Sequence, residues 1–194
     1  MDLGLKGHRV IVTGAASGIG LAIAKAFQAE GAEVRICDVN SDAIAASGFE
    51  GKVCDVSDAK ASEKFIDDMV ADLGGLDTLV NNAGIAGPTS PVEEVSPDDW
   101  NQTLGVCLSG QFHMTRAAVA SLRASENPSI INLSSLAGRV GFALRTPYAA
   151  AKWGVIGFTE SLAIELGSDG IRVNAILPGL VEGERQTRVL QAIL

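Results

Sequence analysis

The chain has 194 residues, of which 47% are hydrophobic and 20% are charged, and its formal net charge at pH 7 is -8. This size and apolar content predict a single domain, residues 1–194, built on one core. The acidic balance argues against nucleic acid or an anionic membrane as a partner, because both need clustered Lys and Arg. The sequence has no apolar run of membrane-spanning length and no secretory signal pattern, so we expect a cytoplasmic protein.

Strands and helices are predicted to alternate along the chain. The hydrophobic pattern predicts strands near residues 8–13, 33–38, 51–54, 76–80, 129–134 and 171–176. It predicts helices near residues 18–30, 41–47, 58–73, 97–124 and 147–167. Because right-handed helical crossovers join parallel strands, this order predicts an α/β fold in three layers, with a doubly wound parallel sheet between helices.

The first strand runs directly into a glycine-rich turn at the start of a helix. Gly14, Gly18 and Gly20 lie in this turn, with Ser17 and Ile19 beside them. Glycines there allow a tight bend and a close approach of a pyrophosphate to the backbone, while the helix N-terminus favours the anion. The spacing differs from Gly-x-Gly-x-x-Gly, and a turn with a purely structural role is the alternative.

The second strand ends in an acid, Asp38. An acid at this place is expected to accept hydrogen bonds from the adenosine ribose of a dinucleotide and to repel a 2′-phosphate. The turn offers Ala15, Ala16 and Ser17 instead of a basic group, so NAD is favoured over NADP. The alternative is that Asp38 caps the helix that begins near Ser41.

The three cysteines are odd in number and lack metal-binding spacing: Cys37, Cys54 and Cys107. We expect them to be reduced, mostly buried thiols, and we expect no metal site.

Tyr148 and Lys152 stand four residues apart in the last long helix, and Ser135 precedes them. A helix places residues four apart on one face, so the ammonium would lie beside the phenol and favour its ionised form. Together the three side chains could move a proton to or from a hydroxyl. The spacing alone also occurs on ordinary surface helices.

These motifs together resemble the short-chain dehydrogenase/reductase family, from about residue 5 to about residue 183. The matching segments, in the family's order, are residues 13–20, Asp55-Val56, Asn81-Asn82-Ala83-Gly84, Ser135, Tyr148 with Lys152, and Pro178-Gly179. The resemblance implies a Rossmann-type fold and hydride transfer between NAD(H) and a secondary alcohol or ketone.

The resemblance also implies a role for each matching residue. Tyr148 would be the general acid or base, Ser135 would hold the substrate oxygen, and Lys152 would bind the nicotinamide ribose. Ser134, next to Ser135, is given a backbone or cofactor role. The remaining predicted cofactor contacts are Asp55 and Val56 at the adenine, Asn82, Ala83 and Gly84 at the adjacent ribose, and Pro178, Gly179 and Val181 at the nicotinamide. The alternative to cofactor binding for Asn81 and Asn82 is a purely structural role, in which an asparagine forms the turn at the end of a strand.

Two positions depart from the family pattern. Cys107 stands where the family usually has an asparagine that supports the proton relay from the lysine, and a thiol is a weaker hydrogen-bonding group. Gly183 stands where a threonine usually binds the nicotinamide carboxamide. The family also continues past this chain's last residue through a substrate lid and a seventh strand, so we expect a missing C-terminal part.

Apolar residues are predicted to border the substrate, which favours a neutral secondary alcohol or ketone: Ile85, Ala86, Ala137, Phe142 and Leu180. Arg145 is expected to be a solvated loop arginine, and the alternative is that it binds an acidic group of the substrate.

The helix near residues 147–167 is apolar around most of its circumference. We therefore expect a homodimer, or a homotetramer built from it, through this helix and the helix that contains Cys107. Two alternatives to the enzyme are a nucleotide-binding sensor or scaffold without turnover and a structural subunit of a hetero-oligomer. The presence of Ser135, Tyr148 and Lys152 favours the enzyme.

Overall fold

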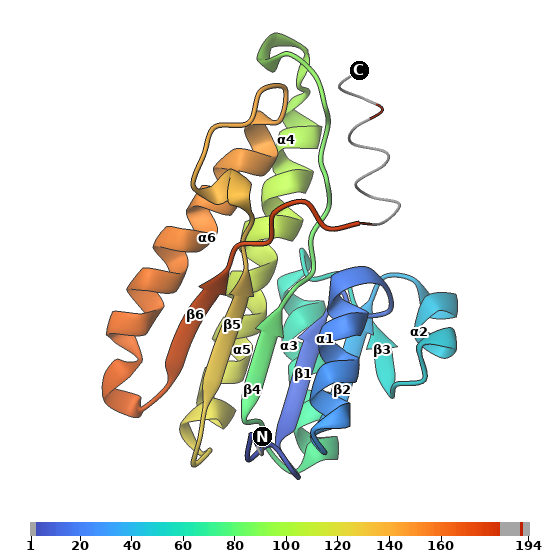
Figure 1. Cartoon of the computed structure of the whole chain (residues 1–194), viewed down its shortest axis with the longest axis vertical. Helices are drawn as coiled ribbons and strands as arrows, with labels where there is room; N and C mark the ends of the chain where they lie inside the picture. The colour runs from blue at the N-terminus through green and yellow to red at the C-terminus, as the bar shows by residue number, and fades with distance from the viewer. Residues whose placement is uncertain (1–2, 183–190, 192–194) are drawn as a thin grey trace.

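The structure, a computed structural model of the chain, describes residues 3–182 and residue 191 (Figure 1). Within these residues, six parallel strands form one sheet in the order β3-β2-β1-β4-β5-β6. Their bounds are β1 Arg9–Thr13, β2 Glu33–Asp38, β3 Gly51–Val53, β4 Thr78–Asn81, β5 Ser129–Leu133 and β6 Arg172–Ile176. The predicted doubly wound, Rossmann-type sheet is confirmed. The strand order reverses between β1 and β4, and ligands of such sheets bind at the carboxyl ends of the strands beside that reversal.

Helices cover both faces of the sheet. Their bounds are α1 Gly18–Ala29, α2 Ser41–Ser47, α3 Ala59–Leu73, α4 Pro97–Leu104, α5 Gly110–Arg123 and α6 Thr146–Glu165. One core cluster joins Ile11, Leu79 and Ile130 to α3, α5 and α6, and the other joins Val10 and Val80 to α1 and α2. Side chains of a strand alternate between faces, which is why neighbouring residues of β1 and β4 enter different clusters. Figure 1 shows α1 on the near side of the sheet and α3 and α5 behind it.

The helix predicted near residues 97–124 is confirmed in extent, but it is not α-helical throughout. A π-helical turn, Gly105–Ser109, separates α4 from α5 and contains the fully buried Cys107. At the start of α5, Gly110 packs on Val56, whose Cγ2 would lie 2.5 Å from an added Cβ. The apolar pattern of a sequence does not reveal one widened turn within a helix, because the pattern on either side of that turn is nearly unchanged. Such turns occur often at functional sites.

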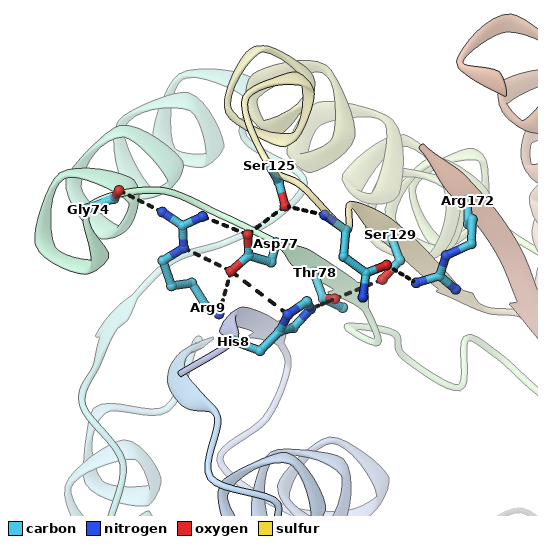
Figure 2. A network of polar contacts seen from close by, with 9 residues as sticks. His8, Arg9, Gly74, Asp77, Thr78, Ser125, Ser129 and Arg172 are labelled. Carbon is cyan, nitrogen blue, oxygen red and sulfur yellow. Dashed lines mark hydrogen bonds and ion pairs between the residues drawn. The ribbon is translucent and has the colours of Figure 1, made fainter. Parts of the chain in front are cut away.

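A polar network ties the strands together at their amino ends, opposite the glycine turn (Figure 2). The carboxylate of Asp77 accepts hydrogen bonds from Arg9 N and Nε at 2.8 Å each and from Arg9 Nη2 at 2.6 Å. It also accepts from Ser125 Oγ at 2.5 Å. The bonds from the Arg9 side chain hold the pKa of Asp77 well below its usual range. Because Asp77 directly precedes β4, this carboxylate joins β1 and β4 to the loop before β5.

His8 extends the same network from β4 to β5. Its Nε2 lies 2.9 Å from Thr78 Oγ1, which in turn lies 2.8 Å from Ser129 Oγ. Burial lowers the pKa of His8.

The described residues contain no helix that is both long and apolar enough to cross a membrane.

Candidate active site

The glycine turn interlocks with the turn that follows β4. Gly14 has φ of +60°, and a Cβ there would lie 2.7 Å from Ala83 Cα. At Gly20 a Cβ would lie 2.4 Å from Asn82 Nδ2. Gly18 has φ of +55° and open space on its Cβ side, and Ser17 makes no side-chain hydrogen bond as the N-cap of α1. The packed side of the turn therefore requires glycine, while the open side and the start of α1 leave room for an anionic ligand.

The Asn82 side chain holds the two turns together. Its Nδ2 donates to Thr13 O at 2.9 Å and to Gly14 O at 2.8 Å. Thr13 Oγ1 accepts from the backbone N–H groups of Asn82 and Ala83 at 3.0 and 3.1 Å. The side-chain amide of Asn82 thus has the structural role that was the alternative to cofactor binding: its hydrogen bonds fix the backbone beside Gly14.

Asn81 points into the core instead. Its Nδ2 donates to Asn132 Oδ1 at 2.9 Å and to Thr115 Oγ1 at 3.0 Å, and Asn132 Nδ2 donates to Thr159 Oγ1 at 3.0 Å. This buried polar chain joins β4, β5, α5 and α6, so the amide of Asn81 serves the scaffold on which the site lies.

Asp38 turns toward the glycine turn. Its Oδ2 accepts from Ala16 N and its Oδ1 accepts from Asn40 N, both at 3.2 Å. The N-cap of α2 is Asn40, whose side chain accepts from Ala43 N at 3.0 Å. The alternative in which Asp38 caps that helix is therefore wrong, and the carboxylate lies beside the turn where the sequence analysis places a ribose.

Asp55 and Val56 follow β3 at the same edge. Asp55 is exposed, and its Oδ1 accepts from Ser57 N at 2.9 Å and from Ser57 Oγ at 2.7 Å. Val56 is only 4% exposed, and its carbonyl accepts hydrogen bonds from His113 Nδ1 at 3.0 Å and Ser62 Oγ at 3.2 Å. These bonds fix the backbone of Val56, while the Asp55 carboxylate faces solvent.

Tyr148 and Lys152 share one face of α6, as their spacing predicts. The Nζ atom of Lys152 lies 5.8 Å from the centroid of the Tyr148 ring. It donates to Leu133 O, at the carboxyl end of β5, at 2.6 Å. Lys152 is 3% exposed, so the ammonium is held inside the protein by the end of a strand next to the phenol.

The two serines after β5 have different surroundings. Ser134 is buried, and its Oγ donates to Lys152 O at 2.8 Å, which gives it a backbone role. Ser135 is half-buried, and its Oγ accepts from Ala137 N at 3.2 Å. Gly138 brings this loop onto α6, since a Cβ there would lie 2.6 Å from Lys152 O. Of the two hydroxyls, that of Ser135 is the more exposed.

Arg145 contradicts the expectation of a solvated loop arginine. It is 3% exposed, its Nη2 donates to Ala86 O at 2.7 Å, and its Cζ lies 4.9 Å from the centroid of the Tyr148 ring. The segment before α6 folds back on the segment after β4, where Ser90 N donates to Leu144 O at 3.0 Å. Leu144 has φ of +61°, a conformation with a steric cost for a residue with a Cβ. The site therefore contains two cations near one phenol, and only the lysine carries a sequence signal.

Cys107 lies between the segment after β4 and Lys152. Its Sγ accepts from Ile85 N and donates to Ile85 O, both at 3.4 Å. A Cβ at Gly84 would lie 3.6 Å from this sulfur and 3.7 Å from Lys152 Nζ. The thiol and the ammonium thus border the same space beside Gly84, and the position that departs from the family pattern belongs to the immediate surroundings of the lysine.

The segment after β6 joins the site from the other side. Pro178 O accepts from Leu136 N at 3.0 Å, which places this segment against the loop of Ser135. Gly179 and Val181 are exposed. Gly183 lies outside the described residues, so its predicted effect on nicotinamide binding stays a prediction.

The residues predicted to border the substrate differ in exposure. Ile85 and Ala86 are half-buried, Ala137 is buried, and Phe142 and Leu180 are 37% and 78% exposed. Two open hollows in the described surface lie elsewhere, one between α2 and β3 and the other beside β3 and α3, and contain none of the predicted catalytic side chains. The candidate site lies where Tyr148, Lys152 and Arg145 come together, beside the carboxyl end of β5. In the part of the chain that the structure describes, no three His, Cys, Asp or Glu side chains are grouped as metal ligands.

Comparison with known proteins agrees with this geometry. A family model described as short chain dehydrogenase matches residues 8–193. The chain is 40% identical over 189 residues to D-threitol dehydrogenase of Mycolicibacterium smegmatis, which covers 93% of this chain and 72% of that protein. It is 38% identical over 186 residues to D-beta-hydroxybutyrate dehydrogenase of Cupriavidus necator, covering 91% and 72%. The solved structure of NAD+-bound xylitol dehydrogenase matches with a TM-score of 0.92 and 32% identity, covering 97% of this chain and 76% of that one. The chain therefore belongs to the short-chain dehydrogenase family of oxidoreductases.

Proposed function

We propose that this protein is an NAD-dependent oxidoreductase that interconverts a secondary alcohol and a ketone, with Tyr148 as the general acid or base. The observation that carries the proposal is the position of Lys152. Its ammonium is held by Leu133 O at 2.6 Å, at the carboxyl edge of the sheet, and lies 5.8 Å from the Tyr148 ring. A buried cation fixed next to a phenol is an arrangement suited to proton transfer.

Each catalytic side chain has a defined role in this proposal. Tyr148 takes the proton from the substrate hydroxyl during oxidation and returns it during reduction. Ser135 donates a hydrogen bond to the same oxygen and orients it toward the phenol. Lys152 holds its ammonium beside the Tyr148 ring and binds ribose hydroxyls. When bound, the nicotinamide supplies the hydride acceptor or donor.

The residues at the carboxyl edge fit a dinucleotide. The open side of Gly18 and the start of α1, with Ser17 and Ile19, suit a pyrophosphate. Asp38, held against Ala16 N at 3.2 Å, would accept from the adenosine ribose and repel a 2′-phosphate, which favours NAD. The other proposed contacts are Gly14, Gly20, Asp55, Val56, Asn82, Ala83, Gly84, Pro178, Gly179 and Val181.

The names of the relatives narrow the substrates worth testing. D-Threitol, D-beta-hydroxybutyrate and xylitol, named for the similar proteins, all carry a secondary hydroxyl. The half-buried apolar residues Ile85 and Ala86 beside Cys107 support a neutral substrate in this chain.

The test is a spectrophotometric assay of NAD+ reduction over these three compounds and a simple secondary alcohol. We expect turnover with at least one of them, and we expect Tyr148→Phe to lower it at least about 100-fold while NADH fluorescence titration shows unchanged binding. Asp38→Ala should reduce the preference for NAD+ over NADP+. Full turnover in Tyr148→Phe, or an equal preference for the two cofactors in the wild type, would contradict the proposed roles.

One observation favours a second candidate, a protein that binds the dinucleotide without turnover. Cys107 occupies the relay position, and both described hydrogen bonds of its thiol go to the backbone of Ile85. NADH binding without reduction of NAD+ by any compound of the panel would support this candidate and reject the enzyme.

We also propose a homodimer formed through α5 and α6. Phe112 of α5 and Trp153 of α6 are each 48% exposed, and the Phe112 ring packs edge-on against Phe158 at 6.5 Å. Large apolar side chains that stay exposed on neighbouring helices are typical of an interface. Sedimentation should show a dimer or tetramer that Phe112→Glu dissociates, and a wild-type monomer at micromolar concentration would reject this assembly.

A further inference from the structure

Two of the three cysteines meet at the β3 edge of the sheet, away from the proposed proton-transfer site. Cys37 lies in β2 and is fully buried, and Cys54 directly follows β3 and is 4% exposed. Both side chains belong to the core cluster on the α3 face. The parallel register pairs Cys37 with Lys52, two residues before Cys54, and Cys54 N donates to Asp38 O at 3.1 Å. The two thiols thus extend from adjacent strand ends toward the same side of the sheet.

The two thiols interact. Interaction with Cys54, together with burial, raises the pKa of Cys37, and interaction with Cys37 lowers the pKa of Cys54. Of the pair, Cys54 is therefore the thiol that ionises first and is also the one nearer to solvent.

Access to this pair runs through the weakest strand of the sheet. β3 has three residues, pairs on one side only, and exposes 60% of Val53. A short edge strand opens locally at a lower cost than the central strands. A small oxidant can reach Cys54 through such openings.

We propose that Cys37 and Cys54 form a dithiol site that a peroxide oxidises to an intramolecular disulfide. The Cys54 thiolate attacks the peroxide oxygen, the O–O bond breaks, and Cys54 becomes a sulfenic acid as one water is released. The Cys37 sulfur then attacks the Cys54 sulfur, the S–O bond breaks, and a second water leaves. In total the two thiols lose two protons and two electrons, and one hydrogen peroxide is reduced to two waters.

The disulfide would act on the proposed dinucleotide site, a consequence that rests on the proposed function. Each cysteine directly precedes an acid proposed for the adenosine half of the cofactor, Asp38 or Asp55. A disulfide holds its sulfur atoms about 2.05 Å apart, which is closer than two thiols in hydrogen-bond contact. Forming it would draw the ends of β2 and β3 together and move both acids relative to Gly14. Oxidation should therefore weaken NADH binding, and bound NADH should slow oxidation.

The first experiment needs no enzyme activity. The native chain is treated with hydrogen peroxide, free thiols are alkylated, and the protein is digested without reduction for mass spectrometry. We expect a linked peptide that contains Cys37 and Cys54, disappears after dithiothreitol, forms equally in Cys107→Ser, and is absent from Cys37→Ser and Cys54→Ser. Absence of the linked peptide from oxidised wild type that keeps its circular dichroism would overturn the proposal, as would linkage to Cys107 in equal amount.

The second experiment measures NADH affinity of the reduced and oxidised forms by fluorescence titration. We expect at least about a tenfold weaker affinity after oxidation of the wild type, restored by dithiothreitol, and no change in Cys37→Ser treated in the same way. Equal affinities of the two forms, with the disulfide present, would overturn the link to the cofactor and leave the proposed function intact. If the reduced form binds no NADH, the proposed function fails, while the linked peptide still decides whether the dithiol site exists.

Discussion

Replacing Asp77 by asparagine should destabilise the fold more than any comparable change at an exposed ion pair. The substitution keeps the shape of the side chain but removes the charge and turns an amide NH2 group toward the donors of Arg9. Removing one partner of a buried, hydrogen-bonded ion pair costs about 3–5 kcal/mol. The Arg9 side chain is 28% exposed, so water can replace part of what it loses, and we expect about 2–3 kcal/mol. For a chain of this length, that corresponds to a fall in Tm of about 4–12 °C.

The assay is urea unfolding followed by circular dichroism, with Asp72→Asn as the matched control. Asp72 also pairs with an arginine, Arg35, at 2.6 Å, but its side chain is 49% exposed, and we expect a loss below about 1 kcal/mol. Because Arg9 holds the folded-state pKa of Asp77 below its unfolded value of about 4, the stabilisation is present above that pH and is lost as the pH falls further. The difference between wild type and Asp77→Asn should therefore shrink in acid. Equal free energies of unfolding for Asp77→Asn and Asp72→Asn at pH 7 would refute the reasoning.

Three further substitutions test other contacts. Gly20→Ala should lower both Tm and NADH affinity, because the new Cβ would lie 2.4 Å from Asn82 Nδ2, whereas Gly167→Ala, with nothing within 4 Å, should change neither. Arg145→Met should reduce kcat about 2- to 30-fold with NADH affinity retained, because the cation over the Tyr148 ring is lost. Arg145→Lys should recover part of the lost kcat. Equal kcat in the wild type and both variants would reject this role. Burial lowers the pKa of His8, so wild-type stability should decline as the pH falls below about 6.5, and thermal melts of His8→Gln should lack this decline.

The parts of this protein that the sequence predicts well depend on local pattern. The alternation of strands and helices, the glycine turn and the four-residue step from Tyr148 to Lys152 each follow from a few neighbouring residues, and the observed strands end within two residues of those predicted. Asp38 was also placed correctly beside the turn, because a parallel sheet brings the carboxyl ends of neighbouring strands to one edge.

The features that sequence reasoning missed depend on contacts between distant segments. Arg145 has no local sign of burial, and its hydrogen bond to Ala86 O joins it to a segment far away in the sequence. The π-helical turn at Cys107 keeps nearly the same apolar pattern as a regular helix, so nothing in the local sequence marks it. The local sequence around Asp77, likewise, is that of an ordinary acid before a strand and gives no sign of its polar network.

By itself, the sequence determined the doubly wound fold and the placement of Tyr148 and Lys152 on one helix face, since hydrophobic period, glycine geometry and helical spacing act over short stretches of chain. Only the tertiary structure decided which charged groups are buried, what surrounds the phenol, and that Cys37 and Cys54 lie in one core cluster. Burial and electrostatic surroundings depend on how segments far apart in the chain pack together, and no local pattern carries that information.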